Sequence, residues 1–139
     1  LGWKLEAPAP RNMKISEART KVELTEQGKW TTVLGSQGWN RGVHSWSVRV
    51  DKTKAQGNIF LGVATAGATR TAYCGKDRNG WGWIGCMACW HNGSKTRSNF
   101  GTRLKTGDVV RLELDCSARK LTYYKNGTLM GVGFDGTLP

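Results

Sequence analysis

The sequence has no long apolar run and no leader-like start. Its richest hydrophobic stretch, residues 59–66, is broken by Gly62 and Thr65, whereas a membrane-spanning helix needs about 20 consecutive apolar residues. No basic head followed by an apolar stretch opens the chain, so no signal peptide is recognised. We expect no membrane contact. Because the first residue is Leu rather than Met, we also expect this segment to belong to a longer chain. Within that chain we expect it to be a monomeric domain.

Cysteines are few for 139 residues: Cys74, Cys86, Cys89 and Cys116. This is far below the density of a disulfide-stapled secreted scaffold, so we expect reduced thiols and a cytoplasmic location, with the nucleus as the alternative. The pair Cys86 and Cys89 has metal-site spacing, but residues three apart on an extended strand point to opposite faces. No second ligand pair of standard spacing accompanies it. We expect no metal and no cofactor.

Catalytic patterns are missing as well. The ten carboxylates show no paired spacing of the kind that a glycosidase needs. His44 and Ser45 are neighbours and would face opposite sides of a strand, so they cannot form a nucleophile and base pair. No glycine-rich stretch ends in the Gly-Lys-Ser/Thr of a phosphate loop. The sequence therefore predicts a non-enzymatic domain without catalytic residues.

Positive charge is abundant but evenly spread. Lys and Arg number 21 against 10 Asp and Glu, and residues 1–70 carry 11 of the basic and 5 of the acidic residues. This favours a mildly basic solvated surface with weak nucleic-acid binding. The main alternative function is a basic β-sandwich that binds RNA or single-stranded nucleic acid, for which seven tryptophans could supply stacking surfaces. A lectin-like sugar site ranks last because the acidic calcium ligands are lacking.

Period-two alternation between turn residues predicts an all-β fold. We expect strands at Val43–Val50, Val109–Leu114, Leu121–Tyr123 and Leu129–Phe134, with weaker strands at Val22–Leu24 and Trp30–Leu34. Residues 59–66 read as a strand buried on both faces, and residues 81–90 as two short strands or one bent strand. Asn126-Gly127 and Asn92-Gly93 predict hairpin turns, since both residue types tolerate positive φ.

Two long loops carry the candidate binding residues. Residues 67–80 contain Arg70, Tyr73, Lys76 and Arg78, and residues 35–42 contain Trp39, Asn40 and Arg41. Loops on a rigid sheet scaffold commonly carry binding sites, and Tyr, Trp and Arg are enriched at interface hot spots. For each aromatic taken singly, a core-capping role is an equal alternative.

The order of motifs resembles the SPRY domain family. The resemblance rests on five pieces in order over about residues 30–138: Gly42–Val48, Phe60–Ala64, Trp81–Trp83, Gly107–Val110 and Leu121–Gly127 with Gly131–Phe134. It implies a bent sandwich of two antiparallel sheets with concanavalin-like jelly-roll topology. It also implies a protein-binding surface formed by loops, with no catalysis.

Within the family, residues 62–66 and Tyr73 look most similar to the SOCS-box SPRY adaptors, which hold short Asn-containing peptides and recruit them for ubiquitination. Tyr73 carries over as a pocket residue, and Asn58 as a further contact. We therefore expect substrate recognition for a ubiquitin ligase, with a protein or acidic peptide as partner. Residues 1–139 are expected to form one domain, with residues 1–29 as an N-terminal extension. The family's usual C-terminal strand does not follow Pro139 in this sequence, so we expect an exposed sheet edge or completion by further chain.

Overall fold

The computed structural model describes residues 2–3, 12–25, 28–54 and 56–139. In these residues the regular secondary structure consists of β-strands, and no helix long and apolar enough to cross a membrane occurs among them. The chain divides into a smaller unit, residues 1–38 with 69–73, and a larger unit, residues 39–68 with 74–139. Much of the predicted N-terminal extension, namely residues 1, 4–11 and 26–27, lies outside the described residues.

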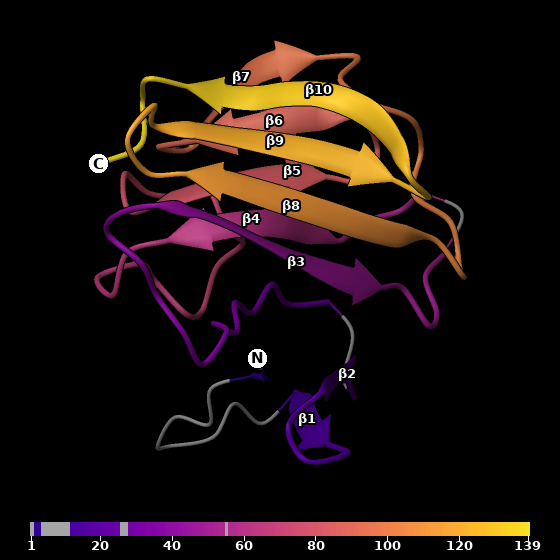
Figure 1. Cartoon of the computed structure of the whole chain (residues 1–139). Helices are drawn as coiled ribbons and strands as arrows, with labels where there is room; N and C mark the ends of the chain where they lie inside the picture. The colour runs from indigo at the N-terminus through magenta and orange to yellow at the C-terminus, as the bar shows by residue number, and fades with distance from the viewer. Residues whose placement is uncertain (1, 4–11, 26–27, 55) are drawn as a thin grey trace. The chain divides into compact units, whose positions relative to one another are not determined.

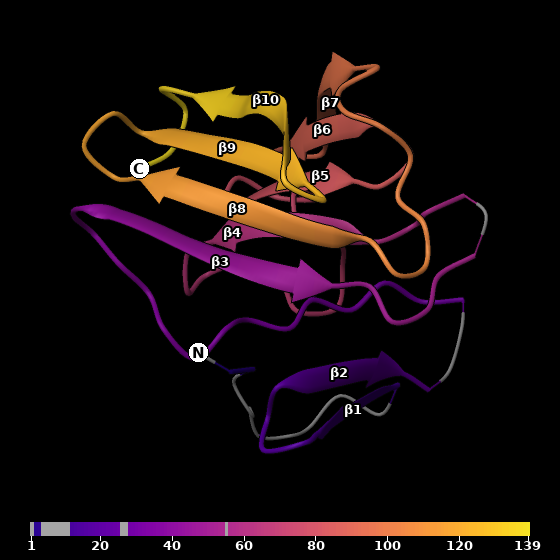
Figure 2. The same cartoon turned by 45° about the vertical axis from the view of Figure 1, so that its right-hand side comes forward.

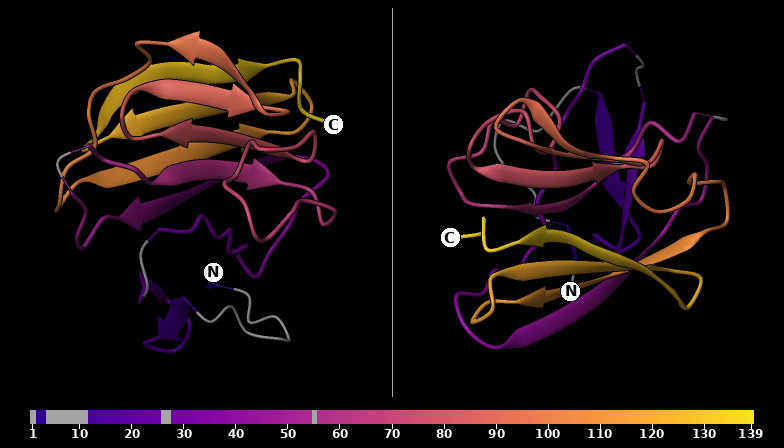
Figure 3. Two further views of the ribbon diagram at one scale, coloured as in Figure 1. Left: turned by 180° about the vertical axis from the view of Figure 1, so that it is seen from behind. Right: turned by 90° about the horizontal axis from the view of Figure 1, so that it is seen from above.

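The larger unit is built from two four-stranded antiparallel sheets (Figure 1). Sheet I has the order β10-β9-β8-β3 and contains β3 (Val43–Arg49), β8 (Val109–Asp115), β9 (Lys120–Lys125) and β10 (Thr128–Asp135). Sheet II has the order β4-β5-β6-β7 and contains β4 (Phe60–Ala64), β5 (Gly80–Ile84), β6 (Ala88–His91) and β7 (Ser94–Ser98). The sheets face each other as two layers (Figure 3). The predicted all-β sandwich is confirmed.

Alternation of apolar and polar residues decides which side of each strand enters the core. Along β3, Trp46 and Val48 are half-buried while Ser45 and Ser47 are exposed, as a period of two requires. Trp46 lies opposite Leu112 of β8, which is almost fully buried. The alternation in the sequence therefore located the inner face of sheet I correctly.

The two Asn-Gly pairs form hairpin turns as predicted. Asn126 and Gly127, with φ values of 52° and 81°, connect β9 to β10, and Asn92 and Gly93, at 53° and 73°, connect β6 to β7. Positive φ at both central residues is the signature of the two-residue turn that matches the twist of the flanking strands. The four residues at the two turns are exposed.

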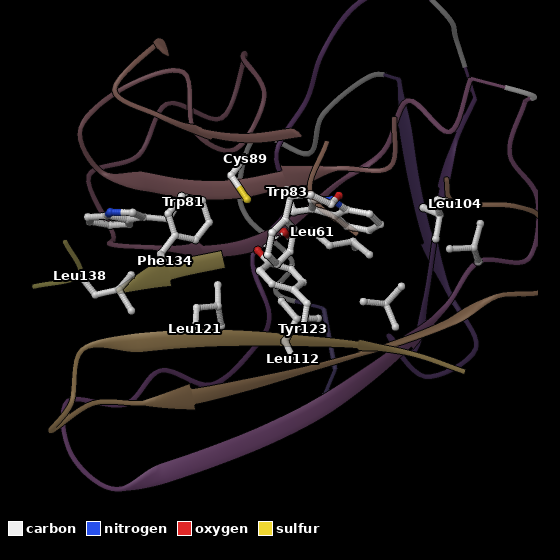
Figure 4. Close-up of a cluster of buried hydrophobic side chains, with 13 residues drawn as sticks. Leu61, Trp81, Trp83, Cys89, Leu104, Leu112, Leu121, Tyr123, Phe134 and Leu138 are labelled. Carbon is white, nitrogen blue, oxygen red and sulfur yellow. Dashed lines mark hydrogen bonds between the residues drawn. The ribbon is translucent and has the colours of Figure 1, made fainter. Parts of the chain in front are cut away.

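Aromatic and aliphatic side chains fill the space between the sheets (Figure 4), and two of the aromatic side chains donate hydrogen bonds to backbone carbonyls. The Tyr123 hydroxyl of β9 donates to the Leu61 carbonyl of β4 at 2.8 Å, so one hydrogen bond crosses the core from sheet I to sheet II. Trp83 Nε1 donates to the Phe100 carbonyl at 2.9 Å. Burial raises the pKa of Tyr123 well above its ordinary value, so this phenol stays protonated and keeps donating.

The strands of the larger unit leave loops at two ends, which are named here for a residue in each (Figure 2). The Val43 end comprises residues 39–42, 65–68, 74–79, 116–119 and 136–139. The Asp108 end comprises residues 50–54, 56–58, 85–87, 101–108 and 126–127. Backbone hydrogen bonds join the segments of the Asp108 end, including Gly107 N to Val50 O at 2.7 Å and Leu104 N to Gly85 O at 2.8 Å.

One side of the sandwich is bridged by a cation. Arg97 of β7, the edge strand of sheet II, donates from Nη1 to the Val132 carbonyl of β10, the edge strand of sheet I, at 2.6 Å. Its guanidinium also lies 4.7 Å from the ring centroid of Phe100. At the other edges, β3 and β4 pair with no further strand among the described residues.

The smaller unit contains an antiparallel hairpin of β1 (Met13–Ser16) and β2 (Lys21–Leu24). The prediction of a strand at Trp30–Leu34 is wrong, because these residues are irregular. Thr32 donates instead to the separate segment 69–73, so the hydrogen bonds of this stretch do not form a ladder. Neither β1 nor β7 was predicted, and β7 (Ser94–Ser98) is wholly polar and exposed.

Candidate protein-interaction loops

Tyr73 lies in a segment of the smaller unit that one threonine anchors. The Thr32 N–H donates to the Arg70 carbonyl at 2.8 Å, and Thr32 Oγ1 donates to the Ala72 carbonyl at 2.6 Å. Tyr73 packs edge-on against Trp30, with ring centroids 5.8 Å apart and planes at 68°. Trp30 is 41% exposed. The two hydrogen bonds from Thr32 thus hold the backbone next to Tyr73. The Tyr73–Trp30 pair is partly open to solvent.

A stack of rings supports the loop before β3. Trp39 lies parallel to His44, with centroids 4.5 Å apart, and also stacks on Trp46 at 5.5 Å. His44 Nε2 is 2.8 Å from the Arg41 carbonyl, and because a carbonyl only accepts, this ring nitrogen carries a proton. Asn40 and Arg41, which follow Trp39 in the chain, are exposed. The loop is therefore shaped by aromatic packing beneath it.

Residues 74–79 are held against the outer face of sheet II by backbone packing. A Cβ on Gly82 would lie 2.3 Å from the Cys74 carbonyl oxygen, which means that only glycine permits this approach. The Cys74 thiol donates to the carbonyls of Val63 and Trp81, each at 3.5 Å. Lys76 and Arg78 stay exposed on this segment. The glycine in β5 thus fixes the loop that carries two predicted binding residues.

The β6–β7 turn holds the same segment from a second direction. Asn92 N donates to the Asp77 carbonyl at 3.1 Å, and Gly93 N donates to the Gly75 carbonyl at 2.9 Å. Within the segment, Asp77 Oδ1 accepts from the Asn79 N–H at 2.9 Å. Such bonds hold the cations of the segment on a defined backbone.

Cys74 and Cys89 have the chemistry of packing groups. Burial raises the pKa of Cys74 to about 12 and that of Cys89 to about 12, so both remain thiols near neutral pH, whereas a thiolate is the nucleophile and metal ligand. Cys86 lies in the turn between β5 and β6, while Cys89 faces the core. All four cysteines are free. Among the described residues, no group of three or more His, Cys, Asp or Glu side chains could hold a metal ion.

The predicted binding residues fall into three places. Trp39, Asn40, Arg41, Lys76 and Arg78 lie at the Val43 end of the larger unit. Asn58, which precedes β4, lies at the Asp108 end, so the fold does not bring it to the others in that unit. Arg70 and Tyr73 belong to the smaller unit.

Trp30 and Thr32 are the site residues that sequence reasoning missed. Their link to residues 70–73 spans about forty positions, and no local pattern signals such a contact. Trp30 was instead expected in the strand Trp30–Leu34, so the sequence offered no signal of this contact.

The comparisons with known proteins agree with this architecture. The family model for the SPRY domain matches residues 43–137. SPRY domain-containing SOCS box protein 1 of Homo sapiens is 30% identical over 117 residues, which cover 75% of this chain and 43% of that protein. F-box/SPRY domain-containing protein 1 of Anopheles gambiae is 30% identical over 110 residues, covering 72% of this chain and 42% of that protein. The chain thus spans less than half the length of these curated relatives.

Solved structures show the same fold. The SPRY domain of human HERC1 superposes with a TM-score of 0.67 at 21% identity and covers 77% of this chain and 67% of that chain. The TRIM65 PSpry domain superposes with a TM-score of 0.75 at 21% identity, covering 100% of this chain and 82% of that chain. The fold is thus the jelly-roll β-sandwich of SPRY domains. The chain belongs to the SPRY domain family.

Proposed function

We propose that this domain binds a linear peptide or a partner loop, and that Tyr73 is its principal contact. The supporting observation is the Tyr73–Trp30 pair, which is partly open to solvent while Thr32 holds the adjacent backbone at Arg70 and Ala72. A rigid aromatic pair can hold an apolar or polar anchor residue at low entropic cost. Lys76 and Arg78, exposed on their own anchored segment, favour ligands with acidic residues.

We further propose that the domain is non-catalytic and recognises substrates for a ubiquitin ligase. The support comes from the relatives, whose names join a SPRY domain to a SOCS box or an F-box. The cytoplasmic location and the monomeric state expected from the sequence remain predictions.

The alternative, nucleic-acid binding, has less support. Proteins that bind single strands expose aromatic rings along a basic groove. Of the seven tryptophans, only Trp30 is exposed, four are half-buried, and Trp81 and Trp83 are buried. The geometry therefore favours a protein ligand.

The experiment selects peptides from a random library on the domain and titrates the best one against variants. We expect Tyr73→Ala to lower the affinity by about 2 kcal/mol or more, as a hot-spot aromatic does. Arg70→Ala and Arg78→Ala should slow association and flatten its salt dependence. Tyr124→Ala is the matched control, because Tyr124 stacks on Arg111 of sheet I. Unchanged binding by a folded Tyr73→Ala domain would refute the assignment.

A further inference from the structure

The Asp108 end gathers four cations on two loop segments. Lys52 and Lys54 flank Thr53, and Arg103 and Lys105 flank Leu104. All four cations are exposed, whereas Thr53 is half-buried and Leu104 has no exposed surface. Each segment thus turns its middle residue inward and its two cations outward.

Hydrogen bonds hold the two segments together. Thr53 N donates to Thr106 Oγ1 at 2.9 Å, and Thr106 Oγ1 donates to the Thr53 carbonyl at 3.1 Å. Arg103 Nη1 donates to the Gln56 carbonyl at 3.3 Å. The two pairs of cations are therefore neighbours on a preformed surface.

The carboxylates at this end are already engaged. Asp51 Oδ1 accepts from Arg49 Nε at 2.6 Å. Asp108 accepts from Asn126 and from the Lys105 N–H and lies 3.6 Å from Lys125 Nζ. Neither is described in an ion pair with Lys52, Arg103 or Lys105. An external acidic group would add a favourable charge interaction with those exposed cations.

The residue types at this end decide between two polyanions. Its segments contain no Trp, Tyr, Phe or His, so they offer no ring on which a nucleic-acid base could stack. The cations instead occur two residues apart in each segment. In an extended peptide, side chains on one face are also two residues apart, about 7 Å along the chain.

We propose that the Asp108 end is a second binding surface, for an extended acidic polypeptide with carboxylates at alternate residues. Lys52 and Lys54 bind carboxylates as one pair, and Arg103 and Lys105 as the other. This surface lies at the opposite end of the sandwich from Trp39, Lys76 and Arg78. The domain would therefore be able to hold an acidic partner while the other loops hold a peptide.

The test measures binding of a twelve-residue peptide of alternating Glu and Ser at low salt. The quadruple variant Lys52→Gln, Lys54→Gln, Arg103→Gln and Lys105→Gln should lose about tenfold or more in affinity, because several preorganised charges act together. The matched variant Lys14→Gln, Arg19→Gln, Lys29→Gln and Lys95→Gln removes the same charge from exposed positions that belong to neither proposed site. It should lose less than about threefold through the general field.

Two further measurements keep the outcomes separate. The double variant Lys52→Gln, Lys105→Gln should lose an intermediate amount of affinity for the peptide. It should unfold at the wild-type temperature, because these two side chains have no described hydrogen bond. Equal losses from the two quadruple variants, or no peptide binding, would overturn the proposal. A uridine twelve-mer that binds more tightly than the peptide, through the same four cations, would assign the surface to nucleic acid instead. Tyr73→Ala should leave peptide binding at this end unchanged, so the two proposals fail independently.

Discussion

The two ends of the sandwich are stabilised by different interactions. At the Val43 end, rings stack on rings and the backbone of residues 74–79 lies on glycine in β5. At the Asp108 end, side chains of Asp108, Asn126 and Thr106 bond neighbouring loops, and cations face solvent. Close packing responds to side-chain volume, whereas charges and hydrogen bonds respond to pH and salt. Substitutions at the two ends should therefore be sensitive to different conditions.

The largest effect is expected from Gly82→Ala. The new Cβ would lie 2.3 Å from the Cys74 oxygen, so residues 74–79 must move, and the free energy of unfolding should fall by about 3 kcal/mol. Gly38→Ala is the control, since nothing lies within 4 Å of its Cβ position, and it should change stability by less than about 0.5 kcal/mol. Urea unfolding measures both. Equal stability of the two variants would mean that the loop does not depend on this packing.

Asp108→Asn tests the other end through pH. Burial alone would raise the pKa of Asp108, but hydrogen bonds from Asn126 and the Lys105 N–H, with the charge of Lys125, lower it overall. The stabilisation is therefore fully present above the ordinary pKa of about 3.9 and is lost as the pH falls through the lowered folded pKa. We expect a loss of about 1 kcal/mol at neutral pH that shrinks in acid.

Urea midpoints measured from about pH 7 down to about pH 2.5 check this dependence. Asp135→Asn, which removes an exposed carboxylate near the Val43 end, serves as the control. A wild-type advantage over Asp108→Asn that stays constant across this range would contradict the assigned role.

The smallest effect compares single cations at opposite ends. Lys105→Gln relieves repulsion among the cations of the Asp108 end and should raise stability by a few tenths of a kcal/mol, that is ~0.3. Lys120 lies between Asp115 and Asp135 in its cross-strand row, so Lys120→Gln should lower stability by a similar amount. Both changes should vanish at about 1 M salt, where the Debye length is about 3 Å. Shifts of the same sign would indicate that net charge alone matters.

Most of the larger unit was predictable because its signals are local. Alternation marked β3 and β8, and Asn-Gly pairs marked two turns, since each feature depends on a few adjacent residues. The strand expected at 59–66 is shorter, Phe60–Ala64, and the prediction that it is buried on both faces is wrong, because β4 is an edge strand in which only Leu61 is buried. The polar β7 has no apolar face to reveal it and is defined by pairing with β6.

The candidate site was less predictable because its geometry depends on distant contacts. Tyr73 was selected by residue type, loop position and family resemblance, but its packing on Trp30 and the anchor at Thr32 join segments far apart in the chain. The charge count gave an even distribution along the sequence, yet folding places Lys52 and Lys54 beside Arg103 and Lys105. Sequence spacing cannot report such a juxtaposition.

Arg97 affects how an edge strand of this domain would meet an incoming strand. Its guanidinium caps the Val132 carbonyl on the edge strand β10, so an incoming strand would find an occupied acceptor and a bulky charge there. Charged side chains at sheet edges are a recognised defence against edge-to-edge aggregation. Arg97 thus places a charge and an occupied backbone acceptor where an incoming strand would have to pair with this part of β10.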